Sequence, residues 1–192
     1  MKRRTAIFSF GGVMLSSLLP AVAANAVTAS TAATAAATSD PLSIENNQKF
    51  LADYAKQKGV IVRPSGLMFR IIQNGYGKRP QPTDSVKVYY TGKLINGVIF
   101  DGTSPDLPAT MKLSDVIRGW VEALQLMREG DHWQLVIPPS LGYGERGSPD
   151  GGKLIPPSQD LIFDLKLITT TPAPKRGEKG YIPDPGDKDE EQ

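Results

Sequence analysis

Alternation of apolar and polar residues predicts the strands of this chain, and it is clearest near the C-terminal end. Residues 161–167 carry leucine or phenylalanine at every second position, with Asp164 and Lys166 among the residues between them. Because successive side chains of a strand point to opposite faces, this pattern predicts a strand that is buried on one side. Pro156 and Pro157 come shortly before it. They lack the N–H groups that a ladder of hydrogen bonds needs, so they predict a stiff, extended approach to the strand.

Four further segments show patterns typical of strands. Residues 85–94 alternate well, with Val86, Val88 and Tyr90 on one face. The dipeptide Asn96-Gly97 then predicts a tight hairpin turn, because both residues tolerate a positive φ. Strands joined by short turns pair in antiparallel fashion, so we expect a strongly curved antiparallel sheet of about five strands. These strands are residues 67–72, 85–94, 98–100, 131–137 and 161–168.

Residues 43–60 predict an N-terminal helix that precedes the sheet. Ser43 is a typical N-cap residue, and Gly59 is typical of a helix end. An isolated helix of this length is marginally stable, so its apolar stripe should pack on the domain or on a second copy of the chain. The stripe consists of Ile44, Leu51, Tyr54 and Ala55.

A second helix is predicted inside the domain, capped by Ser114 or Asp115 and ended by Gly130. Its apolar residues recur at helical spacing from Ile117 to Met127. One short helix set against an antiparallel sheet places the fold in the α+β class, with the sheet wrapped on the helix.

The N-terminus has the composition of an export signal. Residues 1–26 comprise a basic start, an apolar run from Ala6 to Leu19 and a small-residue cleavage site at Ala24-Asn25-Ala26. Serine and glycine interrupt the short apolar run, so a cleaved signal peptide is favoured over the alternative, an uncleaved membrane anchor. Arg3 and Arg4 leave open whether export follows the twin-arginine route or the general one.

Two further segments lack the composition of a packed domain. Residues 27–42 form a linker rich in alanine and threonine, and residues 170–192 form a tail rich in proline, glycine and charge. Neither has enough large apolar side chains to offset the entropy of ordering, so both are expected to be disordered. The acidic end of the tail is interpreted as a solubilising segment rather than a metal site.

Composition excludes several kinds of chemistry. The chain has no cysteine and a single histidine, His132, so thiol nucleophiles, disulfides and cysteine- or histidine-rich metal sites are ruled out, and no cofactor is expected. His132 is interpreted as a solvated strand residue. The 22 basic and 20 acidic residues become 19 and 20 when Lys2, Arg3 and Arg4 leave with the signal, a net charge of −1. No basic run remains, so no nucleic-acid surface is expected.

Five short motifs follow one another along the predicted domain. They are Val88–Gly92 (VYYTG), Gly97–Asp101 (GVIFD), Val116–Trp120 (VIRGW), Leu141–Gly144 (LGYG), and Leu154–Pro157 (LIPP) with Leu161–Asp164 (LIFD). In this order they closely resemble the FKBP-type peptidyl-prolyl cis–trans isomerases, over a domain that we place at residues 64–169. The start of this domain and the helix before it are more similar to bacterial exported members related to the macrophage infectivity potentiator group.

The resemblance implies a pocket with Trp120 as its floor and with Tyr90, Asp101 and Tyr143 as catalytic residues. Asp101 is expected within hydrogen-bonding reach of Tyr90, and the Tyr143 hydroxyl and the Ile117 N–H are expected to donate to carbonyls beside the substrate proline. The implied substrate-binding residues are Phe100, Val116, Ile117, Trp120, Ile155 and Phe163, with Ile155 as a rim that folds over the proline. Taken singly, these residues have plainer interpretations as core, strand and turn residues. Their joint order favours the pocket.

Such a pocket suits rotation about an X–Pro bond, which needs no nucleophile and no proton transfer. Resonance gives the peptide bond a rotational barrier of ~18–20 kcal/mol, while the cis and trans forms of X–Pro differ by only about 0.5–1 kcal/mol. A dry aromatic pocket favours the twisted, less polar amide, and fixed donors hold the flanking chain. The expected function is a peptidyl-prolyl isomerase that assists the folding of exported proteins. A non-catalytic peptide-binding chaperone on the same scaffold is the alternative.

Two departures from the family pattern bear on ligands. Gly102–Pro108 contains no arginine to pair with Asp101, and Ala109–Met111 lacks an aromatic residue beside the pocket, which should lower affinity for macrolide inhibitors. The expected partners are proline-containing exported polypeptides, with macrolides as inhibitors. The N-terminal helix leaves both a monomer and a homodimer open. The periplasm is the expected compartment, and a thylakoid lumen is the alternative.

Overall fold

The computed structural model describes residues 40–174 and 178–179. The predicted signal peptide, most of the predicted linker and nearly all of the predicted tail beyond Pro174 lie outside the described residues. Within the described ranges, no helix combines the length and the apolar character needed to cross a membrane.

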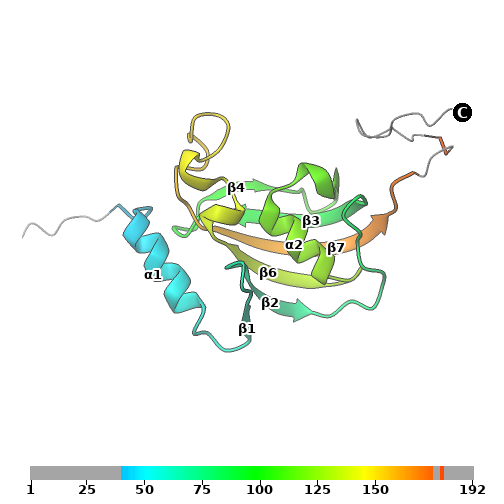
Figure 1. The fold of residues 1–192 in the computed structure, drawn as a ribbon, viewed down its shortest axis with the longest axis horizontal. Coiled ribbons are helices and arrows are strands. Elements are labelled where there is room, and N and C mark those ends of the chain that lie inside the picture. The colour runs from blue at the N-terminus through cyan, green and yellow to red at the C-terminus, as the bar shows by residue number, and fades with distance from the viewer. Residues whose placement is uncertain (1–39, 175–177, 180–192) are drawn as a thin grey trace, which may run out of the picture. The chain divides into compact units, whose positions relative to one another are not determined.

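Seven antiparallel strands form one curved sheet in the described part of the chain (Figure 1). Their order across the sheet is β1-β2-β6-β7-β3-β4, and β5 also pairs with β3. β3 therefore has β7 along one edge, and along the other it has β5 beside its first half and β4 beside its second half. The strands are β1 (Val60–Val62), β2 (Met68–Gln73), β3 (Ser85–Lys93), β4 (Ile99–Gly102), β5 (Ala109–Lys112), β6 (His132–Ile137) and β7 (Leu161–Thr171).

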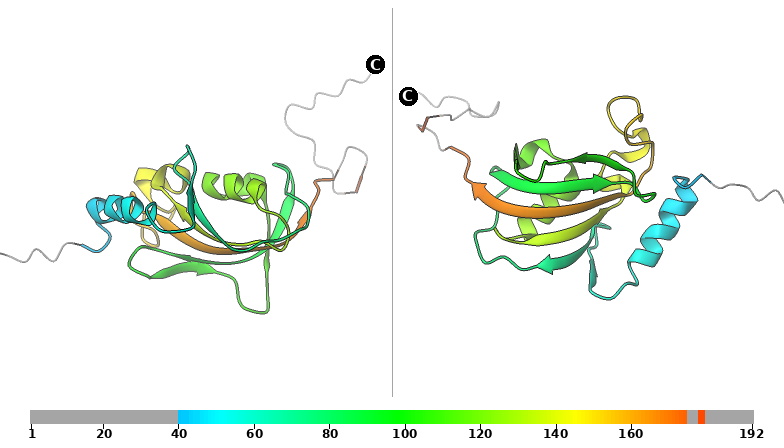
Figure 2. Two further views of the ribbon diagram at one scale, coloured as in Figure 1. Left: turned by 90° about the horizontal axis from the view of Figure 1, so that it is seen from below. Right: turned by 180° about the vertical axis from the view of Figure 1, so that it is seen from behind.

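Two α-helices accompany the sheet among the described residues, α1 (Ile44–Tyr54) and α2 (Arg118–Leu126). Ser43 caps α1 as predicted, because its Oγ accepts a 3.2 Å hydrogen bond from the N–H of Asn46. α2 lies across one face of the sheet, and the sheet curves around it (Figure 2). The predicted α+β architecture is confirmed.

The main core lies between α2 and the face of the sheet that it covers. The predicted alternation of β7 is confirmed, because every second residue from Leu161 to Leu167 is buried, whereas Asp164 and Lys166 are exposed. These four alternating residues of β7 belong to one cluster with Leu124 of α2 and Leu135 of β6. Burial of apolar area in this layer is what fixes the helix on the sheet.

α1 packs against the opposite face of the same sheet. Met68, Val136 and Ile162 form a row across β2, β6 and β7, because Met68 pairs with Val136 and Val136 pairs with Ile162. Together with Tyr54 of α1 they make a second buried cluster. The apolar stripe of the N-terminal helix thus packs on its own domain, except that Ile44, at its beginning, is 59% exposed.

The sheet contains two strands beyond the five predicted segments. β1 and β5 are three and four residues long, too short for alternation to reveal them. They are defined by their pairing, β1 with β2 and β5 with β3. β7 also runs further than predicted, because Thr171 pairs with Ser85 inside the predicted tail.

The predicted start of the domain helix is wrong. Ser114 and Asp115 belong to a separate 3-10 turn, Leu113–Asp115, and the N-cap position of α2 is Ile117, which makes no side-chain cap. Val116 and Ile117 are extended, with ψ of 165° and 151°, so the chain changes direction before the helix begins.

The predicted helix ends are also too late. α2 ends at Leu126, before the predicted Gly130, because Met127 is already extended with ψ of 161°. α1 ends at Tyr54, short of residue 60.

Candidate functional site

An open cavity of about 370 Å³ lies beside the start of α2. We call it the aromatic cavity. β3, β4, β5 and β7 each contribute to its wall, together with the segment before α2 and the turn that carries Tyr143. Eight of the nine predicted site residues line it, and the structure therefore brings them together from distant parts of the chain. The lining residues are Tyr90, Phe100, Asp101, Met111, Asp115, Val116, Ile117, Trp120, Tyr143 and Phe163.

Four aromatic rings form the base and walls of this cavity. The Trp120 ring is only 3% exposed and meets the Tyr90 ring edge to face, with centroids 4.9 Å apart and planes at 89°. Phe163 lies 5.2 Å from Trp120 at 80°, and Phe100 lies 5.6 Å from Phe163 at 89°. Edge-to-face contacts of this kind hold each ring in one orientation. The result is a rigid apolar socket with Trp120 at its base.

Two glycines allow the parts of this socket to approach closely. A Cβ on Gly92 of β3 would lie 2.7 Å from Cζ of Phe100 and 2.8 Å from Cε1 of Phe163. A Cβ on Gly119, in the first turn of α2, would lie 2.6 Å from Cγ2 of Ile137. Both distances are well below the 3.5–4.0 Å of normal carbon contacts. The glycines of the Thr-Gly and Arg-Gly-Trp motifs therefore serve packing.

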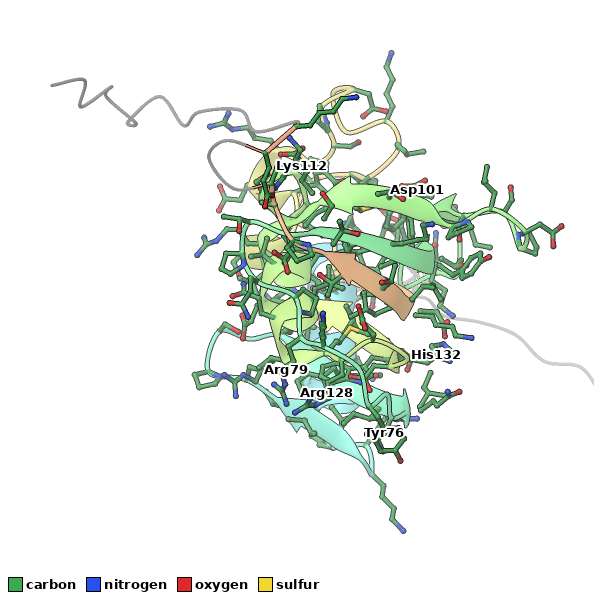
Figure 3. The ribbon with its side chains drawn as sticks, turned by 90° about the vertical axis from the view of Figure 1, so that its right-hand side faces the viewer. Tyr76, Arg79, Asp101, Lys112, Arg128 and His132 are labelled. Atoms are coloured by element: carbon green, nitrogen blue, oxygen red, sulfur yellow. The ribbon has the colours of Figure 1, made fainter. Side chains whose placement is uncertain are left out.

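A fixed polar pair lies at the rim of the cavity. The Tyr90 hydroxyl donates a 2.7 Å hydrogen bond to Oδ2 of Asp101, and Oδ1 of Asp101 accepts a 2.8 Å bond from the Gly102 N–H. This is the predicted Tyr90–Asp101 contact. In Figure 3 Asp101 lies toward the β4 edge of the sheet, whereas Tyr76 and Arg128 lie toward the opposite edge. Among the described residues no cation forms an ion pair with Asp101, in keeping with the lack of arginine in Gly102–Pro108.

Both tyrosines of the cavity remain protonated over a wide pH range. Burial raises the pKa of Tyr90, and its hydrogen bond to Asp101 raises that pKa further. Burial also raises the pKa of Tyr143, with an added contribution from the negative charge of Asp101. A protonated phenol can donate a hydrogen bond, so at neutral pH each hydroxyl is a donor.

Several donors in the cavity lining have no partner in the described part of the chain, among them the Tyr143 hydroxyl, the Ile117 N–H and the buried Nε1–H of Trp120. The Tyr143 hydroxyl makes no hydrogen bond there, although the side chain is only partly exposed. The Ile117 N–H precedes α2, so no turn of the helix supplies an acceptor for it. Tyr143 and Ile117 both line the cavity. Donation from these two groups to the carbonyls of a substrate stays a prediction.

Ile155 is the predicted site residue that the structure places elsewhere. It is 2% exposed, belongs to the main core and is absent from the lining of the cavity, so the structure does not place it at the rim that the resemblance implied. The backbone explains this burial. Its carbonyl accepts from the Ser148 N–H at 2.9 Å, and its N–H donates to Oγ of Ser148 at 3.0 Å. The loop from Gly147 therefore folds back on Ile155 and covers it.

Two lining residues were not predicted as part of the site. Met111 comes from β5, where an unbranched side chain fills the wall that lacks an aromatic residue. Asp115 comes from the 3-10 turn before α2. In the sequence Asp115 indicated a helix cap, and nothing there indicated a place in the site. The departure of Ala109–Met111 from the family pattern, by contrast, did point to Met111.

Other features of the described residues are weaker candidates. A larger hollow of about 830 Å³ is lined by the single loop 143–151, and Tyr143 is its sole aromatic residue, so it offers no comparable socket. His132 lies on β6 with Nε2 2.6 Å from Oδ1 of Asp164, outside the aromatic cavity. No group of three or more histidine, aspartate or glutamate side chains suited to a metal ion occurs in the described ranges.

Comparison with known proteins agrees with this geometry. A family model described as FKBP-type peptidyl-prolyl cis-trans isomerase matches residues 77–168. A probable FKBP-type peptidyl-prolyl cis-trans isomerase of Haemophilus influenzae is 46% identical over 129 residues, which cover 67% of this chain and 52% of that protein. The outer membrane protein MIP of Legionella longbeachae is 44% identical over 135 residues, which cover 67% of this chain and 56% of that protein.

A solved structure gives the same result. The crystal structure of a peptidyl-prolyl cis-trans isomerase from Pseudomonas syringae pv. tomato superposes with a TM-score of 0.63 at 34% identity. The match covers 67% of this chain and 93% of that one. By contrast, the chain spans about half the length of the two relatives above.

Proposed function

Because the chain belongs to the FKBP-type peptidyl-prolyl cis–trans isomerase family, in the group that includes MIP, we propose that it catalyses rotation about X–Pro bonds in polypeptides. The observation that carries the proposal is the aromatic cavity itself. It combines an apolar socket over Trp120 with donors that have no partner among the described residues, including the Tyr143 hydroxyl and the Ile117 N–H.

The socket supplies the apolar part of the mechanism. A proline ring is the natural occupant of a space bounded by Trp120, Phe163 and Tyr90, because it is compact and apolar. Burial there removes water from the adjoining amide. A planar amide is more polar than a twisted one and loses more on leaving water, so the socket favours the twisted state of the bond.

The donors supply the polar part. The Ile117 N–H and the Tyr143 hydroxyl each donate to a carbonyl of the chain that flanks the proline, which holds one side of the bond while the other rotates. Tyr90 is already bonded to Asp101, so it keeps its ring in place and does not compete for those carbonyls. No bond is made or broken and no proton moves, so the chain's lack of cysteine is no obstacle.

Exchange spectroscopy on a short Xaa–Pro peptide tests this function. Uncatalysed exchange takes on the order of tens to hundreds of seconds. We expect the full-length protein at catalytic concentration to shorten this exchange time for at least one peptide of a series that differs in the residue before proline. An uncatalysed rate across a series of apolar, polar and charged residues at that position would contradict the proposal.

The predicted signal peptide supports export, and the Legionella relative is described as an outer membrane protein. We therefore place the protein in an exported compartment, with the periplasm ahead of a thylakoid lumen, and infer that its substrates are exported polypeptides. Cell fractionation after expression with the native N-terminus tests this. Recovery of the protein at its full mass in the cytosol would contradict it.

Met111 lines the wall of the cavity that lacks an aromatic residue, which supports weak binding of macrolides. Calorimetry can measure this affinity.

A further inference from the structure

Asn47 joins α1 to the loop that follows the paired prolines. Its side chain is 2% exposed although it is an amide. Oδ1 accepts a 2.8 Å hydrogen bond from the Asp160 N–H, and Nδ2 lies 3.1 Å from Oε1 of Gln159. Nδ2 also bonds the Ser43 carbonyl at 3.0 Å within its own segment. The contacts of Asn47 with Gln159 and Asp160 cross more than a hundred residues of sequence, so α1 and the 156–160 loop are tied together through one buried side chain.

Gln159 strengthens the same link from the loop side. Its Nε2 donates to the carbonyl of Leu42, just before α1, at 2.9 Å and to the carbonyl of Pro157 at 3.0 Å. Gln159 is 4% exposed. A buried amide with both ends bonded holds its surroundings in one geometry, because any other geometry leaves polar groups without partners.

The 156–160 loop has a reason to need such support. Ser158 has a φ of 59°, the one positive value at a non-glycine residue in the described part of the chain. The left-handed region costs a residue with a Cβ free energy, and such residues persist where neighbours hold them. Ser158 lies directly beside Gln159 and one residue from Asp160, the two residues that Asn47 contacts.

The strained residue in turn holds the turn that carries Tyr143. The Ser158 N–H donates a 2.9 Å hydrogen bond to the carbonyl of Gly144. Tyr143 precedes Gly144 and lines the aromatic cavity. A continuous path of hydrogen bonds and single peptide units therefore runs from Asn47 through the loop to Tyr143.

We propose that Asn47 is a positioning residue for the aromatic cavity: it keeps Ser158 in its left-handed conformation and thereby fixes the Tyr143 turn. The proposal rests on the isomerase function proposed above. It assigns a role to α1, which lies outside the residues 77–168 that the family model matches. α1 then supports the cavity from the opposite face of the sheet.

The decisive variant is Asn47→Ala in the full-length protein. We expect kcat/KM for an Xaa–Pro peptide to fall about 5- to 30-fold, the factor that corresponds to the cost of a left-handed residue. The Ser158 amide should lose protection from hydrogen exchange. Adding Ser158→Gly should restore most of the activity, because glycine adopts positive φ without strain. A purely structural role of Asn47 predicts no such rescue.

Tyr54→Phe is the matched control, because it removes the 3.0 Å bond from α1 to Gln134 without touching the loop. We expect it to leave kcat/KM within about twofold. Equal losses from Asn47→Ala and Tyr54→Phe, or no loss from Asn47→Ala in an active protein, would overturn the proposal. If Asn47→Ala does not fold, Gln159→Ala carries the same test with the same expected direction.

The two proposals fail in different ways. If the wild-type protein shows no isomerase activity, the proposed function fails. The exchange of the Ser158 amide still decides the structural link: unchanged protection in Asn47→Ala overturns it, and lost protection that Tyr54→Phe does not reproduce supports it.

Discussion

The Tyr90 hydroxyl donates to Oδ2 of Asp101 across 2.7 Å, and this bond gives the two tyrosines of the aromatic cavity different roles. Tyr90 is held by Asp101 and contributes its ring to the socket over Trp120. Tyr143 keeps an unpartnered hydroxyl in the described structure, so it is the phenol that is free to donate to a substrate. The same carboxylate raises the pKa of both tyrosines, in addition to the larger effect of burial, and so keeps both as donors.

A double-mutant cycle on Tyr90 and Asp101 tests the first role. Tyr90→Phe and Asp101→Ala each remove the same hydrogen bond, so each should lower kcat/KM about 2- to 10-fold, the range expected for one bond of about 0.5–1.5 kcal/mol. The double variant should lose no more than the worse single variant, because the bond can be lost only once. Additive losses would show that the two residues act independently.

Tyr143→Phe tests the second role. It removes the free donor and keeps the ring, so we expect kcat to fall about 3- to 10-fold with little change in the free energy of unfolding. Tyr76→Phe is the control, because the Tyr76 side chain is 93% exposed and lies away from the cavity (Figure 3). The chaperone alternative predicts a different result. Under it, Tyr143→Phe leaves the suppression of aggregation of an unfolded client unchanged and there is no turnover to lose.

Gly92→Ala tests the close packing of the socket. The added Cβ meets the rings of Phe100 and Phe163 at 2.7 and 2.8 Å, so both rings must move. We expect a loss of about 1–3 kcal/mol in the free energy of unfolding and a larger KM, because the socket changes shape. Gly102→Ala should cost less, because the nearest atom to its added Cβ is the Tyr90 carbonyl oxygen at 3.1 Å. Urea denaturation measures the change in stability, and peptide kinetics measure the change in KM. Equal stability of Gly92→Ala and wild type would contradict the claim that Gly92 is needed for the close packing of the socket.

Much of the sheet and most of the cavity were predictable from the sequence, because their signals are local. Alternation identifies β7, and short motifs place Tyr90, Phe100, Trp120 and Phe163 in one socket by resemblance. The start of α2 was not predictable in this way. Ser114 and Asp115 are good caps by residue type, yet the extended Val116 and Ile117 delay the helix, because tertiary packing overrides a local preference.

Contacts between distant segments account for the remaining differences. Ile155 is buried because the loop from Ser148 folds over it, and nothing in its own sequence neighbourhood announces that fold. The four residues of β5 alternate, but so short a run does not predict a strand, and β5 is defined by its pairing with β3. The bond between Asn47 and Asp160 joins residues 113 positions apart, and both look like ordinary polar surface residues in the sequence.

The buried carboxyl group of Asp160 should make the stability of the protein depend on pH in an unusual direction. It is fully buried, and neither carboxyl oxygen has a hydrogen-bond partner among the described residues. Burial raises its pKa from 3.8 to about 7. The unfolded chain therefore releases this proton near pH 4 while the folded protein keeps it until about pH 7. Between these values the folded state binds more protons, so the contribution of Asp160 to stability falls as the pH rises and levels off above about pH 7.

Asp160→Asn isolates this contribution, because asparagine has nearly the same shape and does not titrate. Other carboxyls act in the opposite direction, for example Glu129, whose pKa is lowered chiefly by the hydrogen bond from the Thr170 N–H, so the pH profile of the wild type alone is not decisive. We expect the variant to gain stability relative to wild type by roughly 2–4 kcal/mol as the pH rises from about 4 to about 7.5. Urea denaturation of both proteins across this range measures the difference. A difference that stays constant with pH would show that Asp160 is ionised in the folded protein, and hence that water or a polar group reaches its carboxylate.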